Sequence, residues 1–172
     1  MADRRPKRDF RGKEENSEFD QKLIDIARVT RVMAGGKRMR FRACVVIGDH
    51  KGKIGYGLGK GADVSLAITK AVNRAKKDMI DIPLRNGSLP HEINMKYKAA
   101  RLLLKPAPSG TGVVAGGAIR AALELSGIDN IVAKMYGSKN KINNIRALFH
   151  ALERLKQTAM KKNVFLKKEK AS

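Results

Sequence analysis

Residues 28–61 read RVTRVMAGGKRMRFRACVVIGDHKGKIGYGLGKG, a stretch that combines two glycine clusters with many basic residues and a single acid, Asp49. Arginine stands at every second position from Arg38 to Arg42, just after the pair Gly35-Gly36 and Lys37. A folded protein tolerates this much self-repulsion when a polyanion covers the surface. The stretch therefore predicts a surface that lies against phosphate groups.

The same stretch predicts a strand with two different faces. Apolar side chains alternate with the arginines, so a core side and a charged side result. The apolar positions are Met39, Phe41, Ala43, Val45 and Ile47. We expect this strand to be the middle one of an antiparallel meander, between strands over residues 23–33 and 53–58.

A helix is predicted next, with Asp63 as its cap. Apolar residues recur at helical spacing from Val64 to Met79, and a polar, mostly basic outer face is left over. That outer face carries Lys70, Asn73, Arg74 and Lys77. The first part of the chain therefore has the predicted order β-β-β-α.

A linker follows, marked by Pro83, the Asn86-Gly87 turn and Pro90. Beyond it the patterns predict strands over 91–97 and 100–105, a helix over 116–126, a strand over 131–136 and a last helix. The last helix has a predicted buried stripe of Ile145, Leu148, Phe149, Leu152 and Leu155. The fold class is therefore α+β, with a second domain of order β-β-α-β-α. The predicted divisions are a disordered tail (1–20), a first domain (21–83), a linker (84–89), a second domain (90–158) and a Lys-rich tail (159–172).

Composition favours nucleic acid as the partner, because the formal net charge is +21. A membrane is not expected, since no apolar run of about 18 residues exists. The single cysteine, Cys44, has no second thiol with which to form a disulfide or share a metal. The first ten residues contain no apolar run, so no secretory signal is predicted and the expected location is the cytoplasm.

Two glycine patterns raise the alternative of a nucleotide-dependent enzyme. Residues 110–115 match G-x-G-x-x-G/A, with Asp129 about twenty residues later, but two prolines interrupt the required turn. The Gly59-Lys60 pair has Ile54 where a phosphate-binding loop needs glycine. The glycines at alternate positions from Gly55 to Gly61 would instead let another backbone or a sugar-phosphate chain approach closely.

Catalytic and metal-binding residues are not apparent. The three histidines, His50, His91 and His150, lie in different predicted elements without metal-ligand spacing. We therefore expect no enzyme activity, no cofactor and no metal. Aromatic content is 5%, which favours recognition of folded RNA by backbone and shape over base stacking. A free RNA-binding regulator or RNA chaperone remains an alternative function.

Four blocks of the chain resemble, in collinear order, the bacterial small-subunit ribosomal protein five family. They are RVTRVMAGGKRMRF, VVIGDHKGKIGYGLGKGADVSLAITKAV, LLLKPAPSGTGVVAGGAIRAALELSGI and AKMYGSKNKIN, and the resemblance covers about residues 21–155. It implies a first domain similar to double-stranded-RNA-binding domains and a second, small α/β domain.

The resemblance also implies a function. The loop at Gly35-Gly36-Lys37, flanked by Arg28, Thr30 and Arg31, would enter small-subunit ribosomal RNA near the junction of head and body. The second domain would meet ribosomal proteins four and eight. The protein would then stabilise the RNA and influence decoding accuracy, without forming a homo-oligomer. The chain departs from the family pattern at Met95, Lys98, Ser109 and Lys141.

The predicted site residues form two sets. RNA is expected to contact Arg28, Thr30, Arg31, Gly35, Gly36, Lys37, Arg38, Arg40, Arg42, Lys51, Lys53, Tyr56 and Lys60. A neighbouring ribosomal protein is expected at Gly110, Thr111 and Gly112. Arg120 is a further candidate that would face either RNA or an acidic protein.

Overall fold

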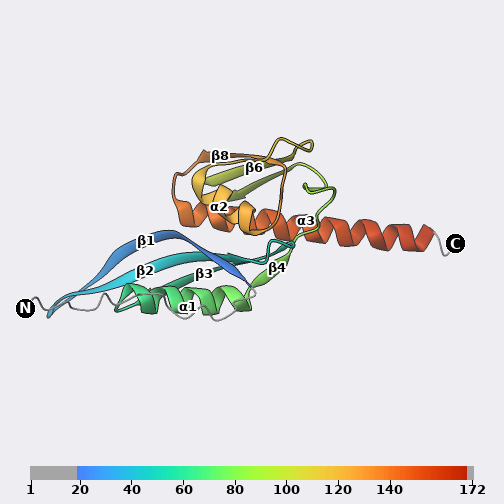
Figure 1. The fold of residues 1–172 in the computed structure, drawn as a ribbon. Helices are drawn as coiled ribbons and strands as arrows, with labels where there is room; N and C mark the ends of the chain where they lie inside the picture. Colours follow the sequence, from blue (N-terminus) through green and yellow to red (C-terminus); the bar gives the residue numbers. More distant parts are fainter. Residues whose placement is uncertain (1–18, 170–172) are drawn as a thin grey trace, which may run out of the picture.

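The computed structural model describes the backbone of residues 19–169 and the side chains of residues 19–156. Two four-stranded sheets form, one from each half of the chain, and three helices accompany them. Figure 1 shows α1 under one face of the first sheet, and α2 and α3 between the two sheets. The predicted α+β fold with two domains is confirmed.

The first sheet is an antiparallel meander in the order β1-β2-β3-β4. Its elements are β1 (Asp20–Met33), β2 (Gly36–Gly48), β3 (Lys53–Gly61), α1 (Val64–Lys77) and β4 (Met79–Asp81). Strand β4 was not predicted, because Met79 continues the apolar spacing of the helix that precedes it. Asp63 stands at the N-cap of α1 as predicted, but its side chain makes no capping hydrogen bond, and its carbonyl accepts from the backbone N–H of Ala67 at 3.0 Å.

The glycines of β3 face α1 and allow the helix to lie close to the sheet. A Cβ atom on Gly57 would overlap the carbonyl oxygen of Ala71, and one on Gly59 would overlap that of Ala67. The helix presents alanine here, so both surfaces are small and the backbones meet. Of the two neighbours expected at these glycines, another backbone and a sugar-phosphate chain, the structure has the first: the backbone of α1 fills the space, so RNA does not approach them.

The second sheet has the order β5-β6-β8-β7, with β7 parallel to β8 and the other pairs antiparallel. Its elements are β5 (Ile93–Tyr97), β6 (Ala100–Pro106), β7 (Val113–Val114), α2 (Gly117–Leu125), β8 (Ile131–Gly137) and α3 (Lys141–Glu169). The two-residue strand β7 was not predicted. Helix α3 continues to Glu169, through the segment for which the sequence predicts a Lys-rich tail. The predicted N-terminal tail falls almost wholly on residues 1–18, outside the described part.

Buried side chains confirm the stripe predicted for α3. All five of its residues are at most 2% exposed. They belong to a core that also contains Cys44, Val46 and Ile54 of the first sheet. The strand face that carries the arginines is thus charged only toward the β1–β2 hairpin. Its other half is buried against the second domain, which the alternation of β2 could not indicate.

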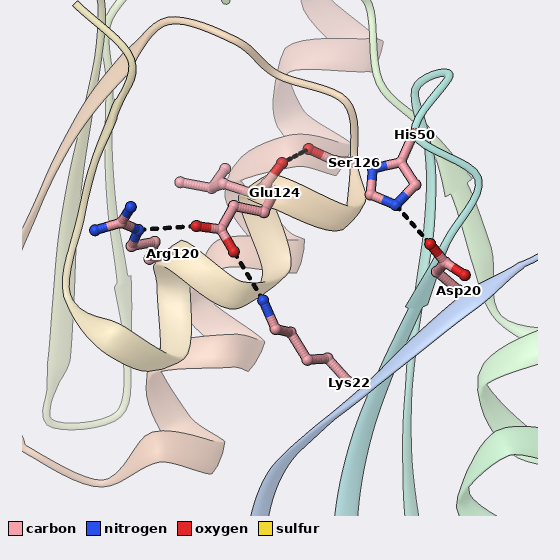
Figure 2. A network of polar contacts seen from close by, with 7 residues as sticks. Asp20, Lys22, His50, Arg120, Glu124 and Ser126 are labelled. Carbon is pink, nitrogen blue, oxygen red and sulfur yellow. Dashed lines mark hydrogen bonds and ion pairs between the residues drawn. The ribbon is translucent and has the colours of Figure 1, made fainter.

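The two halves of the chain are joined by hydrogen bonds around the turn between β2 and β3. His50 donates its backbone N–H to the carbonyl of Leu125 at 3.1 Å, and Gly52 donates to that of Ser126 at 3.0 Å. Figure 2 shows the neighbouring side chains: Glu124 accepts from Lys22 and from Arg120, each at 2.8 Å. These contacts hold the basic hairpin in a defined position relative to the second domain.

The turn between β5 and β6 contains one of the four departures from the family pattern. Lys98 has φ 51°, a left-handed conformation that glycine adopts at lower cost. A second departure, Lys141, begins α3 and lies 3.3 Å from Asp25 of β1. Within residues 19–169, no helix is long and apolar enough to cross a bilayer.

Candidate nucleic-acid interface

Strand register gathers five basic side chains on the sheet face opposite α1. Arg31 pairs with Arg38 across β1 and β2, and Arg42 pairs with Lys60 across β2 and β3. Arg40 lies between them on the same face of β2. Like charges directly opposite one another destabilise a sheet. We call this set the hairpin face: Arg31, Arg38, Arg40, Arg42 and Lys60.

A hollow of about 350 Å³ lies on the hairpin face, toward the end of the β1–β2 hairpin. Val29 and Met33 contribute apolar surface to it, and Arg31, Arg38, Arg40 and Lys60 contribute charge. Thr30, another predicted residue, also lines it. No ion pair engages these four cations within the described residues, so their charge is available to an external anion.

Arg42 differs from the other members of the hairpin face because it is partly buried. Its guanidinium lies 3.8 Å from the carboxylate of Asp25, which also contacts Lys141 at 3.3 Å. Its Nε has no hydrogen-bond partner within the described residues. Part of the charge of Arg42 is therefore balanced inside the protein.

The other predicted hairpin residues lie at the tip or on the opposite face. Arg28 and Thr30 pair with Phe41 and Met39, so their side chains point to the face that α1 covers farther along the sheet. The turn itself is Ala34-Gly35, and Gly36 begins β2 with φ +128°. A Cβ atom on either glycine would meet nothing within 4 Å, so the tip is open to a partner. Lys37 is also exposed.

Three predicted RNA contacts are not part of this surface. Lys51 and Lys53 are exposed, but they lie at the other end of β2, about 40 Å from the tip for a strand of this length. Tyr56 packs on Phe149 of α3, with ring centroids 4.4 Å apart. Tyr56 is partly buried, and the side of its ring that packs on Phe149 cannot also stack on a base.

A larger hollow of about 690 Å³ adjoins the hairpin face at Lys60. Arg42 and Lys60 line it from the sheet, and Lys70, Asn73, Arg74 and Lys77 line it from α1. The sequence contains a signal for these helical residues, since positions 70, 73, 74 and 77 share one helix face. That they lie beside Lys60 depends on the fold.

The predicted protein-contact residues of the second domain lie in two places. Gly110 and Thr111 are exposed in the loop before β7, and Gly112 donates its N–H to Asn130 Oδ1 at 3.1 Å. Arg120 is on α2, where it pairs with Glu124. Ser88 and Asn130, which sequence reasoning missed, are buried polar residues that fasten this loop, with Ser88 Oγ accepting from Ala107 N at 3.2 Å.

The structure also bears on the enzyme alternative. Val113 and Val114 of the G-x-G-x-x-A match form β7, so the glycine pair lies in a loop between two strands, β6 and β7, and not at a turn from a strand into a helix, as dinucleotide binding requires. Burial, with a smaller contribution from Asp25, raises the pKa of the Cys44 thiol to about 11, which leaves it protonated and unreactive. Within the described residues, no three His, Cys, Asp or Glu side chains gather as a metal site.

Comparison with known families decides what kind of protein carries this surface. Residues 19–83 match the family model "Ribosomal protein S5, N-terminal domain", and residues 95–164 match "Ribosomal protein S5, C-terminal domain". The chain belongs to the ribosomal protein S5 family. Members of this family are structural proteins without enzymatic activity, so the expectation of no enzyme is confirmed.

Individual S5 relatives cover nearly the whole chain. It is 45% identical over 157 residues to "Small ribosomal subunit protein uS5c" of Emiliania huxleyi, covering 91% of this chain and 98% of that protein. It is 47% identical over 150 residues to "Small ribosomal subunit protein uS5" of Treponema pallidum, covering 86% and 87%. It is 46% identical over 143 residues to the protein of the same name from Thermus thermophilus, covering 83% and 88%.

Proposed function

We propose that this protein is a structural constituent of the small ribosomal subunit in the cytoplasm. It binds and stabilises small-subunit ribosomal RNA near the junction of head and body, and thereby contributes to the accuracy of translation. The names of its relatives support the assignment to the small ribosomal subunit. The observation that carries RNA binding is the pairing of Arg31 with Arg38 and of Arg42 with Lys60 on a face that the second domain leaves open.

The contacts with RNA phosphate are made by the hairpin face and the hairpin tip. Arg31, Arg38, Arg40 and Lys60 surround one hollow, and Gly35, Gly36 and Lys37 extend the surface to the tip. Arg28 contacts RNA from the opposite face of β1. Phosphate oxygens between these cations relieve the repulsion that the register creates. Thr30 adds a neutral hydrogen-bonding group on the same face of β1 as Arg28.

The second domain contacts neighbouring ribosomal proteins in the same proposal, with proteins four and eight as the partners. The exposed Gly110-Thr111-Gly112 loop and Arg120 are the contact residues. Ser88 and Asn130 hold the base of that loop, so the surface is presented in one conformation. The two proposed domains comprise residues 21–83 and 90–158.

The decisive experiment compares two triple variants of equal charge change. In K37A/R38A/R40A, affinity for small-subunit ribosomal RNA falls and the slope of log K against log salt is flatter by about three. The control, K96A/R101A/K134A, removes three exposed cations from the second sheet. It changes the slope less. Equal losses in the two variants, or an unchanged slope in the first, would contradict the proposal. Circular dichroism confirms that both variants are folded.

A further inference from the structure

The larger hollow lies where strand β3 has an open edge. Strand β4 pairs only with residues 53–55 of β3, and within the described residues no strand covers the same edge from Tyr56 to Gly61. Helix α1 passes beside this edge. Arg74 donates from Nη1 to the carbonyl oxygen of Leu58 at 3.0 Å, a backbone acceptor that strand pairing would otherwise use. The guanidinium is thereby fixed at the rim of the hollow, with four of its five N–H donors left over.

The charge around the hollow is not balanced by the protein. Lys60, Lys70 and Lys77 form no ion pair within the described residues, and all three are exposed. The nearest acid that any cation of the hollow contacts is Asp25, at 3.8 Å from Arg42. Asn73 adds a neutral group that can both donate and accept. An external anion would balance this charge.

The dimensions favour an extended anion over a single small one. Lys77 follows Lys70 by seven positions, which places them about 10 Å apart along the axis of α1. The hollow also shares Lys60 with the smaller hollow on the hairpin face. A chain of phosphates can follow such a line of cations from the sheet, around its edge and onto the helix. An acidic peptide that added as a strand to β3 would need the Leu58 carbonyl, which Arg74 already occupies.

We propose that this hollow is a second RNA-backbone site, continuous with the hairpin face through Lys60, in which Lys70, Arg74 and Lys77 bind phosphates. This inference rests on the proposed function and adds a site on α1 to it. The RNA backbone bends around the open edge of β3 instead of staying on one face of the sheet. Asn73 contacts the sugar or a base edge.

The test uses two lysines whose side chains make no contact that the fold needs. In K70A/K77A, affinity for small-subunit ribosomal RNA falls by about 10- to 100-fold at 0.1 M salt, and the salt slope is flatter by about two. The control is a comparison of two single variants, K70A and K76A. Both remove one exposed lysine from α1, but Lys76 does not line the hollow. K70A flattens the slope by about one and K76A by clearly less.

Failure of this inference can be told apart from failure of RNA binding itself. If K37A/R38A/R40A loses affinity while K70A/K77A binds like the parent, the proposed function stands and the second site is refuted. Equal effects of K70A and K76A would refute it as well, because they would report net charge alone. Loss of binding to poly-glutamate, with RNA binding retained, would assign the hollow to an acidic protein and overturn the proposal.

Discussion

The backbone of Gly57 lies directly against the carbonyl oxygen of Ala71, with no room between them for a Cβ atom. Gly59 and Ala67 repeat this relationship one turn earlier along the helix. Close contact between α1 and β3 brings Lys70 and Arg74 beside Lys60. Small residues in the interior therefore determine where the cations at the edge of the sheet lie.

The G57A variant should be strongly destabilised. The added methyl group overlaps backbone atoms that cannot rotate away, so α1 must move off the sheet, and the free energy of unfolding falls by about 3 kcal/mol. Urea denaturation measures this. In the control G117A, the new methyl group meets nothing within 4 Å at the start of α2, and the stability changes by less than about 1 kcal/mol. Similar losses in both variants would contradict the close packing.

A second pair of glycines isolates the contact between the two domains. Gly127 and Gly112 have φ +75° and +72°, so alanine at either position costs about 1 kcal/mol of backbone strain. Only at Gly127 does the new Cβ also overlap the carbonyl oxygen of His50 in the first domain. We expect G112A to lose about 1 kcal/mol and G127A about 3 kcal/mol in chemical denaturation. Equal losses would mean that the turn between β2 and β3 moves aside freely.

Replacing Lys98 by glycine should stabilise the protein. Lys98 has φ 51°, a conformation strained for lysine, and relief of the strain outweighs the greater freedom of glycine in the unfolded chain. The expected gain is about 0.5 kcal/mol in the free energy of unfolding. In K96G, two residues earlier in the regular strand β5, the same change should lose about 0.5–1 kcal/mol. A loss in both variants would show that the turn does not strain Lys98.

Glu124 should make the stability depend on pH in the acid range. Hydrogen bonds from Lys22, and then from Arg120, lower the pKa of its carboxyl below the ordinary value of 4.5 (Figure 2). A pKa lowered by folding stabilises the protein above the ordinary value and ceases to do so as the pH falls through the lowered one. The parent therefore loses this contribution below about pH 4.5, whereas E124Q lacks it throughout. Urea denaturation at a series of pH values measures the difference.

The control for that experiment is E92Q. Glu92 lies 3.3 Å from Lys105 within the second domain, so its loss removes an exposed ion pair without touching the contact between domains. If the two variants lose stability in parallel across the pH range, the coupling of Glu124 to Lys22 is not what the acid dependence reports. A larger loss at neutral pH in E124Q agrees with a carboxylate that accepts two charged donors.

Local patterns predicted the elements whose causes are local. The alternation of Arg38, Arg40 and Arg42 with apolar residues fixed the faces of β2, and the helical spacing of Ile145 to Leu155 fixed the buried side of α3. The burial of Cys44 and Val46 against the second domain could not be predicted, because the residues that pack on them lie far along the chain. For the same reason the packing of Tyr56 on Phe149 could not be predicted.

The β3 glycines illustrate a different limit. A strand with glycine at every second position indicates that another backbone approaches closely. The pattern is the same whether that backbone belongs to RNA or to a helix of the same protein. The alanines of α1 at positions 67, 71 and 75 were the complementary signal. Short strands such as β4 and β7 were missed since two or three residues carry no period. The second hollow could not be predicted from local patterns, because only the fold brings cations of β2, β3 and α1 together.

The core shared by the two halves has a consequence for synthesis of the chain. Ile54 and Val46 of the first sheet are buried by residues of α2 and α3 that are translated up to roughly 100 residues later. At ordinary rates of elongation, this delay is on the order of 10 s. During that time the nascent meander exposes a flat apolar face. That face of the first domain stays uncovered until α3 leaves the ribosome that makes the chain.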